Sequence, residues 1–85
     1  TMLMSHLACG SEANDPKNAE QRARFEACRT LFPGLRGSLA NSSGIFLGAN
    51  FHYDLARPGC ALYGIHPTEG ENPMQPVVTL SAPIL

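Results

Sequence analysis

The stretch that decides the fold reads SLANSSG and occupies residues 38–44. Its apolar start ends at Asn41, where serines and a glycine follow at once, a pattern typical of a β-strand that turns into a helix. A second stretch of this kind, LARPGC, occupies residues 55–60. Two such turns side by side present unpaired backbone N–H groups to an anion, and Arg57 adds a positive charge. The sequence therefore predicts a site for a phosphorylated ligand.

The same residues also have a purely structural interpretation. Asn41 and Ser42 are common helix caps, and the proline and glycine after Arg57 form a common turn. The ligand interpretation assigns the Ser42 hydroxyl and the backbone of Gly59 and Cys60 to the anion, because glycine allows a close approach of the main chain. Arg57, at the end of an apolar strand, is interpreted equally well as a cofactor contact or as a surface or ion-paired residue.

A long amphipathic segment precedes the first turn. Asn18 is its predicted cap, with Gln21 in capping-box position, and the helix is expected to end before Pro33. Its predicted apolar face carries Phe25, Cys28, Leu31 and Phe32.

Short apolar runs surround this helix and alternate with turns. Strands that alternate with helices are typical of a parallel α/β sheet. Three parallel strands cannot bury both faces of a sheet, so we expect a piece of a larger domain. In (β/α)₈ barrels, phosphate commonly binds at the loops after the last strands, which fits the two turns. The predicted strands cover residues 1–8, 38–41, 53–57 and 77–80.

Composition excludes several classes of function. The net charge of −1 and the charged fraction of 15% predict no binding of nucleic acid. No apolar run is long enough to span a membrane, and the start does not resemble a signal peptide. Three irregularly spaced cysteines fit neither a disulfide framework nor a metal site, which favours a reducing, cytoplasmic location. They are Cys9, Cys28 and Cys60.

The three histidines differ in their surroundings. His6 follows an apolar run and is more often a satisfied core residue in such a place, but it would also lie on the face of the two turns. His52 and His66 fall in predicted loops and are expected to be solvated. Cys9 lies near His6 in the sequence, but no third ligand or base accompanies them, so neither a metal site nor a thiol nucleophile is predicted.

Three stretches together resemble alanine racemase. They are SHLAC at residues 5–9, SLANSSG at 38–44 and DLARPGCALYG at 54–64, in the order and at the spacing of that family. The resemblance implies the last three βα units of a pyridoxal-phosphate-binding (β/α)₈ TIM-type barrel, followed by the first strand of a C-terminal β-domain. It implies barrel at residues 1–65, a linker at 66–76, which holds three prolines, and the start of the β-domain at 77–85.

The resemblance also assigns roles by position. Ser42 and the backbone of Gly59 and Cys60 would bind the phosphate of pyridoxal phosphate. Arg57 would face the pyridine nitrogen, His6 would lie beside the cofactor ring, and Asn41 would order the site. A guanidinium cannot accept a proton, so this nitrogen would stay unprotonated, which suits a racemase. The chain departs from common family residues at Ser11, Ser38 and Cys60, and Ser38 replaces a histidine that supports the arginine in some members.

The catalytic acid–base pair of the family has no counterpart here. The only lysine, Lys17, lies in a loop and cannot be the Schiff-base lysine, and neither Tyr53 nor Tyr63 matches the catalytic tyrosine. The implied protein interconverts L- and D-alanine through a pyridoxal-phosphate aldimine, supplies D-alanine for peptidoglycan and acts as a cytoplasmic homodimer. This chain alone is expected to be inactive. Alternatives are another fold-type III pyridoxal-phosphate enzyme, such as a broad-specificity amino-acid racemase, or a non-catalytic association module.

Overall fold

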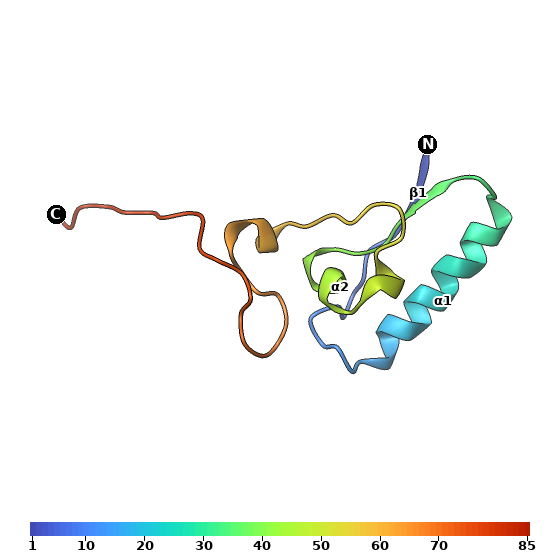
Figure 1. Cartoon of the computed structure of the whole chain (residues 1–85), viewed down its shortest axis with the longest axis horizontal. Helices are drawn as coiled ribbons and strands as arrows, with labels where there is room; N and C mark the ends of the chain where they lie inside the picture. Colours follow the sequence, from blue (N-terminus) through green and yellow to red (C-terminus); the bar gives the residue numbers. More distant parts are fainter.

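A parallel βαβ unit forms the first half of the chain (Figure 1). The computed structural model describes all 85 residues. Strands β1 and β2 pair in parallel, with Met2 opposite Arg36 and Met4 opposite Ser38. The predicted parallel α/β arrangement is confirmed for this part. The elements are β1 (Met2–Met4), α1 (Pro16–Leu31), β2 (Arg36–Ser38), α2 (Ser42–Phe46) and the 3₁₀-helices η1 (Ala49–Phe51) and η2 (Cys60–Tyr63).

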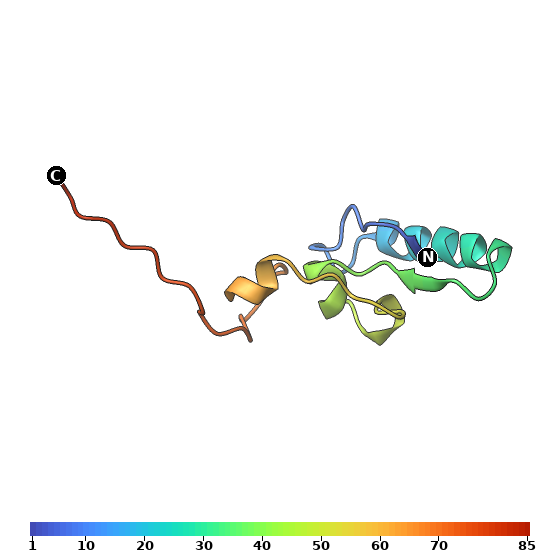
Figure 2. The ribbon, with the colours of Figure 1, turned by 90° about the horizontal axis from the view of Figure 1, so that it is seen from above.

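The core lies where the extended segments after β1 and β2 meet the helices. Leu7, Phe25 and Leu39 form the buried cluster. Figure 2 shows α1 on one side of β2 and α2 on the other, so the extended segments are covered on both sides. Gly44 permits α2 to pack closely, because a Cβ built at this position would lie 2.8 Å from Leu7 Cδ1. The core therefore fixes the turn at residues 41–44 directly against the segment that follows β1.

Helix α1 begins earlier than the sequence indicated. Asp15 is the cap, and its Oδ1 accepts a hydrogen bond from Lys17 N at 2.7 Å, with Pro16 at the first helical position. The predicted cap at Asn18 is wrong, because Asn18 is buried inside the first turn and its Nδ2 donates to the Glu12 carbonyl at 2.9 Å. Two candidate caps three residues apart give the same local signal, and Pro16 decides between them.

Replacing this cap tests the observed start of α1. Asp15→Ala removes the acceptor for Lys17 N, so the free energy of unfolding is expected to fall by about 1 kcal/mol. Asn14→Ala is the control, because Asn14 is exposed and its side chain makes no hydrogen bond. Denaturant unfolding of both variants checks this, and an equal effect of the two changes would contradict the assignment of the cap.

The predicted apolar face of α1 is buried only at Phe25. Cys28 is exposed, and the side chains of Leu31 and Phe32 are 73% and 52% exposed. The reason is that two three-residue strands are too short to cover a helix of 16 residues. The far end of α1 therefore presents apolar surface that this chain does not cover.

The predicted strands are shorter than expected or are not formed. Residues 1–8 contribute only β1, and the strand predicted at 38–41 lies at β2 instead. The residues at 53–57 form no strand, although Asp54 N donates to Gly37 O at 3.0 Å and Arg57 N to Ala40 O at 2.8 Å. Two side chains interrupt the ladder between these bonds.

These interruptions come from Asp54 and Ser38. Asp54 Oδ2 accepts from Gly37 N at 2.7 Å, and Ser38 Oγ donates to the Leu55 carbonyl at 2.7 Å. The backbone N–H of Gly37 and the carbonyl of Leu55 are therefore hydrogen-bonded to side chains and not to a neighbouring strand. Residues 54–57 run beside β2 without joining the sheet.

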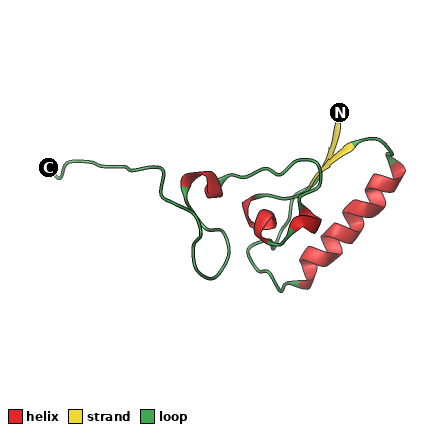
Figure 3. Ribbon diagram, in the orientation of Figure 1, coloured by secondary structure: helices red, strands yellow, loops and turns green.

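The last twenty residues have no helix or strand (Figure 3). The strand predicted at 77–80 is not formed, because a strand needs a hydrogen-bonded neighbour and no other segment lies beside it. Val77, Val78 and Leu80 are exposed instead. None of the helices has the length and apolar character required to cross a membrane.

Candidate functional site

The Ser42 hydroxyl joins the two predicted turns. Ser42 Oγ accepts hydrogen bonds from Gly59 N at 2.7 Å and from Ala61 N at 3.3 Å. Ser42 itself is buried. The turn after β2 and the turn that opens η2 therefore lie side by side, as the sequence predicted. The N–H group of Gly59 points at this hydroxyl, whereas the N–H group of Cys60 donates to no acceptor in the chain.

Ser42 is available for this contact because Asn41 caps α2. Asn41 Oδ1 accepts from Gly44 N at 2.9 Å, so of the two cap candidates, Asn41 and Ser42, Asn41 is the cap. Ser42 Oγ accepts two amide hydrogen bonds, and its own proton has no acceptor in the chain. A hydroxyl in this state can donate one hydrogen bond to a ligand. The site thus holds two unused donors, the Ser42 hydroxyl and the Cys60 amide.

His6 lies at the same site, in contact with Asn41. The distance between Asn41 Nδ2 and His6 Nε2 is 3.2 Å. Because Asn41 Oδ1 already accepts from Gly44 N, the amide nitrogen is the donor in this bond, and His6 Nε2 accepts. The proton of the neutral ring therefore lies on Nδ1. His6 is exposed, so the expectation of a core histidine is wrong and its position on the face of the turns is confirmed.

Arg57 is held by neutral oxygen atoms. Its Nη1 donates to Ser38 Oγ, and its Nη2 donates to the Ser5 carbonyl at 2.6 Å. Ser38 is fully buried, and its hydroxyl donates a hydrogen bond to the Leu55 carbonyl. No carboxylate pairs with Arg57. The interpretation of Arg57 as an ion-paired residue is therefore wrong, and the Ser38 hydroxyl supports the arginine.

The remaining candidates do not join this site. Partial desolvation raises the pKa of the Cys9 thiol, and a hydrogen bond and the negative charge of Asp15 raise it further, which keeps the thiol protonated and unreactive. Burial raises the pKa of the Tyr53 phenol, and Glu26 adds to this effect. The Tyr53 ring packs edge-on against Phe25, with centroids 4.9 Å apart. Tyr53 thus has the character of a packing residue, and the Cys9 thiol is not activated as a nucleophile.

The other two histidines were expected to be solvated in loops, and they are instead half-buried, each with a hydrogen-bond partner. His52 Nε2 lies 2.8 Å from the Ile45 carbonyl. The His66 ring packs edge-on against Phe46 at 4.8 Å, and its Nε2 lies 2.7 Å from Thr68 Oγ1. The hydrogen bond from His52 to the Ile45 carbonyl and the contact of the His66 ring with Phe46 hold both loops against α2.

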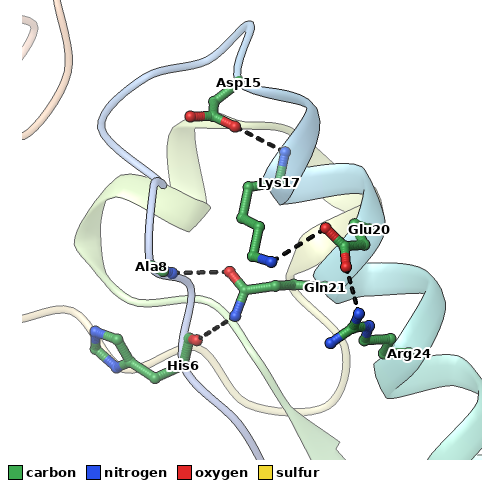
Figure 4. Close-up of polar contacts among 7 residues, drawn as sticks. All are labelled: His6, Ala8, Asp15, Lys17, Glu20, Gln21 and Arg24. Carbon is green, nitrogen blue, oxygen red and sulfur yellow. Dashed lines mark hydrogen bonds and ion pairs between the residues drawn. The ribbon is translucent and has the colours of Figure 1, made fainter.

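Sequence reasoning missed two contributions to the site. Gln21 on α1 forms hydrogen bonds with the backbone of His6 and Ala8, on both sides of Leu7 (Figure 4). The Ser5 carbonyl accepts a hydrogen bond from Arg57. Neither contact follows a local pattern. The one sequence signal for the Gln21 contact was a polar glutamine on the half-buried side of the helix. Its spacing from Asn18 instead suggested that Gln21 belongs to a capping box.

Parallel strands joined by a crossover helix, with polar turns after their carboxyl ends, define an α/β protein. Residues 1–67 match the family model of the alanine racemase N-terminal domain. The chain belongs to this family.

Relatives and solved structures agree with this assignment. The catabolic alanine racemase of Mesorhizobium japonicum is 60% identical over 83 residues, which cover 96% of this chain and 22% of the relative. The alanine racemase of Rhodospirillum rubrum is 60% identical over 85 residues, covering 99% and 23%. The chain thus spans less than a quarter of the length of these curated relatives.

Two crystal structures share the fold. Alanine racemase from Bartonella henselae, solved with covalently bound pyridoxal phosphate, matches with a TM-score of 0.76 and 46% identity, over 84% of this chain and 20% of that one. The enzyme from Corynebacterium glutamicum matches with a TM-score of 0.74 and 28% identity, over 88% and 23%. The fold of this chain is therefore that of a segment of alanine racemase.

Proposed function

We propose that this chain is a segment of an alanine racemase and that its two turns hold the phosphate of pyridoxal phosphate. Family membership and the bound cofactor of the Bartonella henselae relative support the cofactor. The observation that carries the proposal is the Ser42 hydroxyl, which ties the turns together and keeps one free donor. Together with the free amide of Cys60, which follows Gly59 in the chain, it offers two free donors to an anion.

The residues present fit a phosphate group. A Cβ built on Gly59 would meet Ser42 Oγ at 3.9 Å, an ordinary van der Waals contact, so the glycine keeps the space beside this hydroxyl free of a side chain. Cys60 contributes its amide, and its side chain is not required. The glycine therefore leaves open the approach to both donors.

Arg57 faces the pyridine nitrogen in this proposal, and His6 lies beside the cofactor ring. Pyridoxal phosphate supplies an electron sink for the proton removal at the α-carbon of alanine. Arg57 can only donate hydrogen bonds, so it leaves the ring nitrogen unprotonated and limits side reactions such as transamination. Asn41 orients the His6 ring through the bond to Nε2. Ser38 and Ser5 keep the guanidinium in place.

The organisation of the longer protein follows from the same family assignment. Residues 1–65 form the end of a (β/α)₈ barrel, with β1, β2 and the extended run at 54–57 at its last three strand positions. Residues 66–76 are the linker, and residues 77–85 open the C-terminal β-domain. The end of the family match at residue 67 and the irregular, exposed chain that follows support these limits.

The rest of the catalytic machinery lies outside this chain. Lys17 pairs with Glu20 at 3.1 Å on the surface of α1, which supports a Schiff-base lysine elsewhere in the protein. The raised pKa of Tyr53 and its packing support a catalytic tyrosine elsewhere. We place the whole enzyme in the cytoplasm as a homodimer that supplies D-alanine for peptidoglycan.

The full-length protein that carries these residues tests the function. After purification with pyridoxal phosphate, it is expected to show the absorption of the bound cofactor and to convert D-alanine into L-alanine. The 85-residue chain alone is expected to do neither, because it lacks the lysine and tyrosine. A full-length protein that binds the cofactor without racemising alanine would contradict the assignment of alanine as the substrate. Turnover by the isolated chain would contradict the conclusion that the catalytic lysine and tyrosine lie outside it.

Replacing Ser42 tests the phosphate site. Ser42→Ala leaves the amides of Gly59 and Ala61 without an acceptor and removes one donor to the ligand, so the affinity of the full-length protein for pyridoxal phosphate is expected to fall at least about tenfold. The measurement is an absorbance titration of the cofactor-free protein. Ser43→Ala is the matched control, because the Ser43 hydroxyl makes only a 3.4 Å contact with the Pro67 carbonyl. Equal affinities of the two variants would place the phosphate elsewhere.

A further inference from the structure

The side chain of Gln21 holds the segment that follows β1 (Figure 4). Gln21 Oε1 accepts a hydrogen bond from Ala8 N at 2.8 Å, and Gln21 Nε2 donates to the His6 carbonyl at 3.0 Å. The two bonds lie on either side of Leu7, whose side chain is buried in the core. One amide side chain on α1 thus imitates the backbone of a neighbouring strand.

This contact continues where the sheet stops. The last backbone bond between the two strand segments runs from Ser5 N to Ser38 O at 3.0 Å. Beyond Ser5, the main chain at His6 and Ala8 has Gln21 as its hydrogen-bonding partner. The position of His6 therefore depends on α1.

Two groups of the proposed site sit on this short segment. The His6 ring bonds to Asn41, and the Ser5 carbonyl accepts from Arg57. A shift of the main chain at these positions would move the ring of His6 and one of the two acceptors that orient the guanidinium.

We infer that Gln21 is a positioning residue of the cofactor site, which sets the place of His6 and of the Ser5 carbonyl that holds Arg57. This inference rests on the proposed function. Gln21 does not touch the ligand; it acts through the main chain at positions 5 to 8. Its loss should therefore change the chemistry at the ring end of the cofactor more than the binding of the phosphate, which Ser42 and Cys60 provide.

The test compares variants of the full-length enzyme saturated with pyridoxal phosphate. Gln21→Met keeps the length and helix propensity of the side chain and removes both hydrogen bonds. We expect kcat for racemisation to fall about tenfold, with the KM for alanine within about twofold of wild type and a shifted absorption maximum of the bound cofactor. Gln21→Glu keeps the acceptor for Ala8 N and loses the donor to His6, so its kcat should lie between those of wild type and Gln21→Met.

Arg24→Met is the control for a merely structural effect. Arg24 lies one turn further along α1, and its side chain is 75% exposed and pairs only with Glu20. A kcat and an absorption maximum of Gln21→Met equal to those of Arg24→Met would overturn the inference. So would a Gln21→Glu variant with wild-type kcat, should Gln21→Met fail to fold. A wild-type protein without racemase activity would overturn the proposed function and this inference with it, whereas an active wild type with unaffected Gln21 variants would overturn the inference alone.

Discussion

Arg57→Glu is expected to lower the racemisation rate of the full-length protein about 100-fold, the loss found when one fixed donor is removed from an enzyme site. The structure gives one reason, and the proposed place of Arg57 beside the pyridine nitrogen gives a second. A carboxylate cannot donate to the Ser38 hydroxyl and the Ser5 carbonyl, which now hold the guanidinium. A carboxylate beside the pyridine nitrogen would also keep that nitrogen protonated and strengthen the ring as an electron sink. The lost racemisation should therefore be accompanied by a transamination product.

The measurement is kcat for D-alanine together with the amount of pyruvate formed. Arg24→Glu is the control, since it makes the same change of charge on the exposed face of α1 and costs only a surface ion pair. A racemisation rate of Arg57→Glu within about tenfold of the Arg24→Glu rate would contradict the proposal that Arg57 faces the ring nitrogen.

Leu39→Ala is expected to have the largest effect on stability, a loss of about 2–5 kcal/mol in the free energy of unfolding. Leu39 is fully buried and packs with Leu7 and Phe25, so its truncation leaves a cavity between α1 and the extended segments. Leu31→Ala, at a position 73% exposed, is the matched control and should cost less than about 1 kcal/mol.

Denaturant unfolding of the full-length protein, followed by circular dichroism, measures both variants. A shift of the midpoint for Leu39→Ala no larger than that for Leu31→Ala would show that the cluster around Leu39 does not hold this part of the chain together. The cofactor titration of the same variants serves as a second readout, because Leu39 lies two residues before Asn41.

The turns could be predicted from sequence because their chemistry is local. Glycine, proline and serine at 41–44 and 57–60 restrict the backbone within a few residues, and the helix between the strands has a clear period. The ends of the elements were harder to predict from the sequence, since Asp15 and Asn18 are both residue types that commonly cap helices. The proximity of the two turns followed from the parallel arrangement of the segments before them, and the structure brings them together through Ser42.

The strand errors at residues 1–8 and 53–57 share one physical origin, which is side chains that replace backbone partners. Ser38 and Asp54 take the hydrogen bonds that a third strand would have made, and Gln21 takes those of a neighbour for residues 6 and 8. Such contacts join positions 13 to 17 residues apart and leave no periodic signal in the sequence. Single-residue propensities therefore predicted strands where the chain is extended but held by polar side chains.

The neutral anchors of Arg57 have a consequence for solution conditions. Neither the Ser38 hydroxyl nor the Ser5 carbonyl gains or loses a proton between mildly acidic and mildly alkaline conditions. Dissolved ions screen pairs of opposite charges far more than they weaken bonds to neutral oxygens. The guanidinium should therefore keep its orientation in high salt, where an arginine held by a carboxylate on the surface would loosen. If Arg57 faces the pyridine nitrogen as proposed, any dependence of the enzyme on ionic strength would then arise elsewhere than at this arginine.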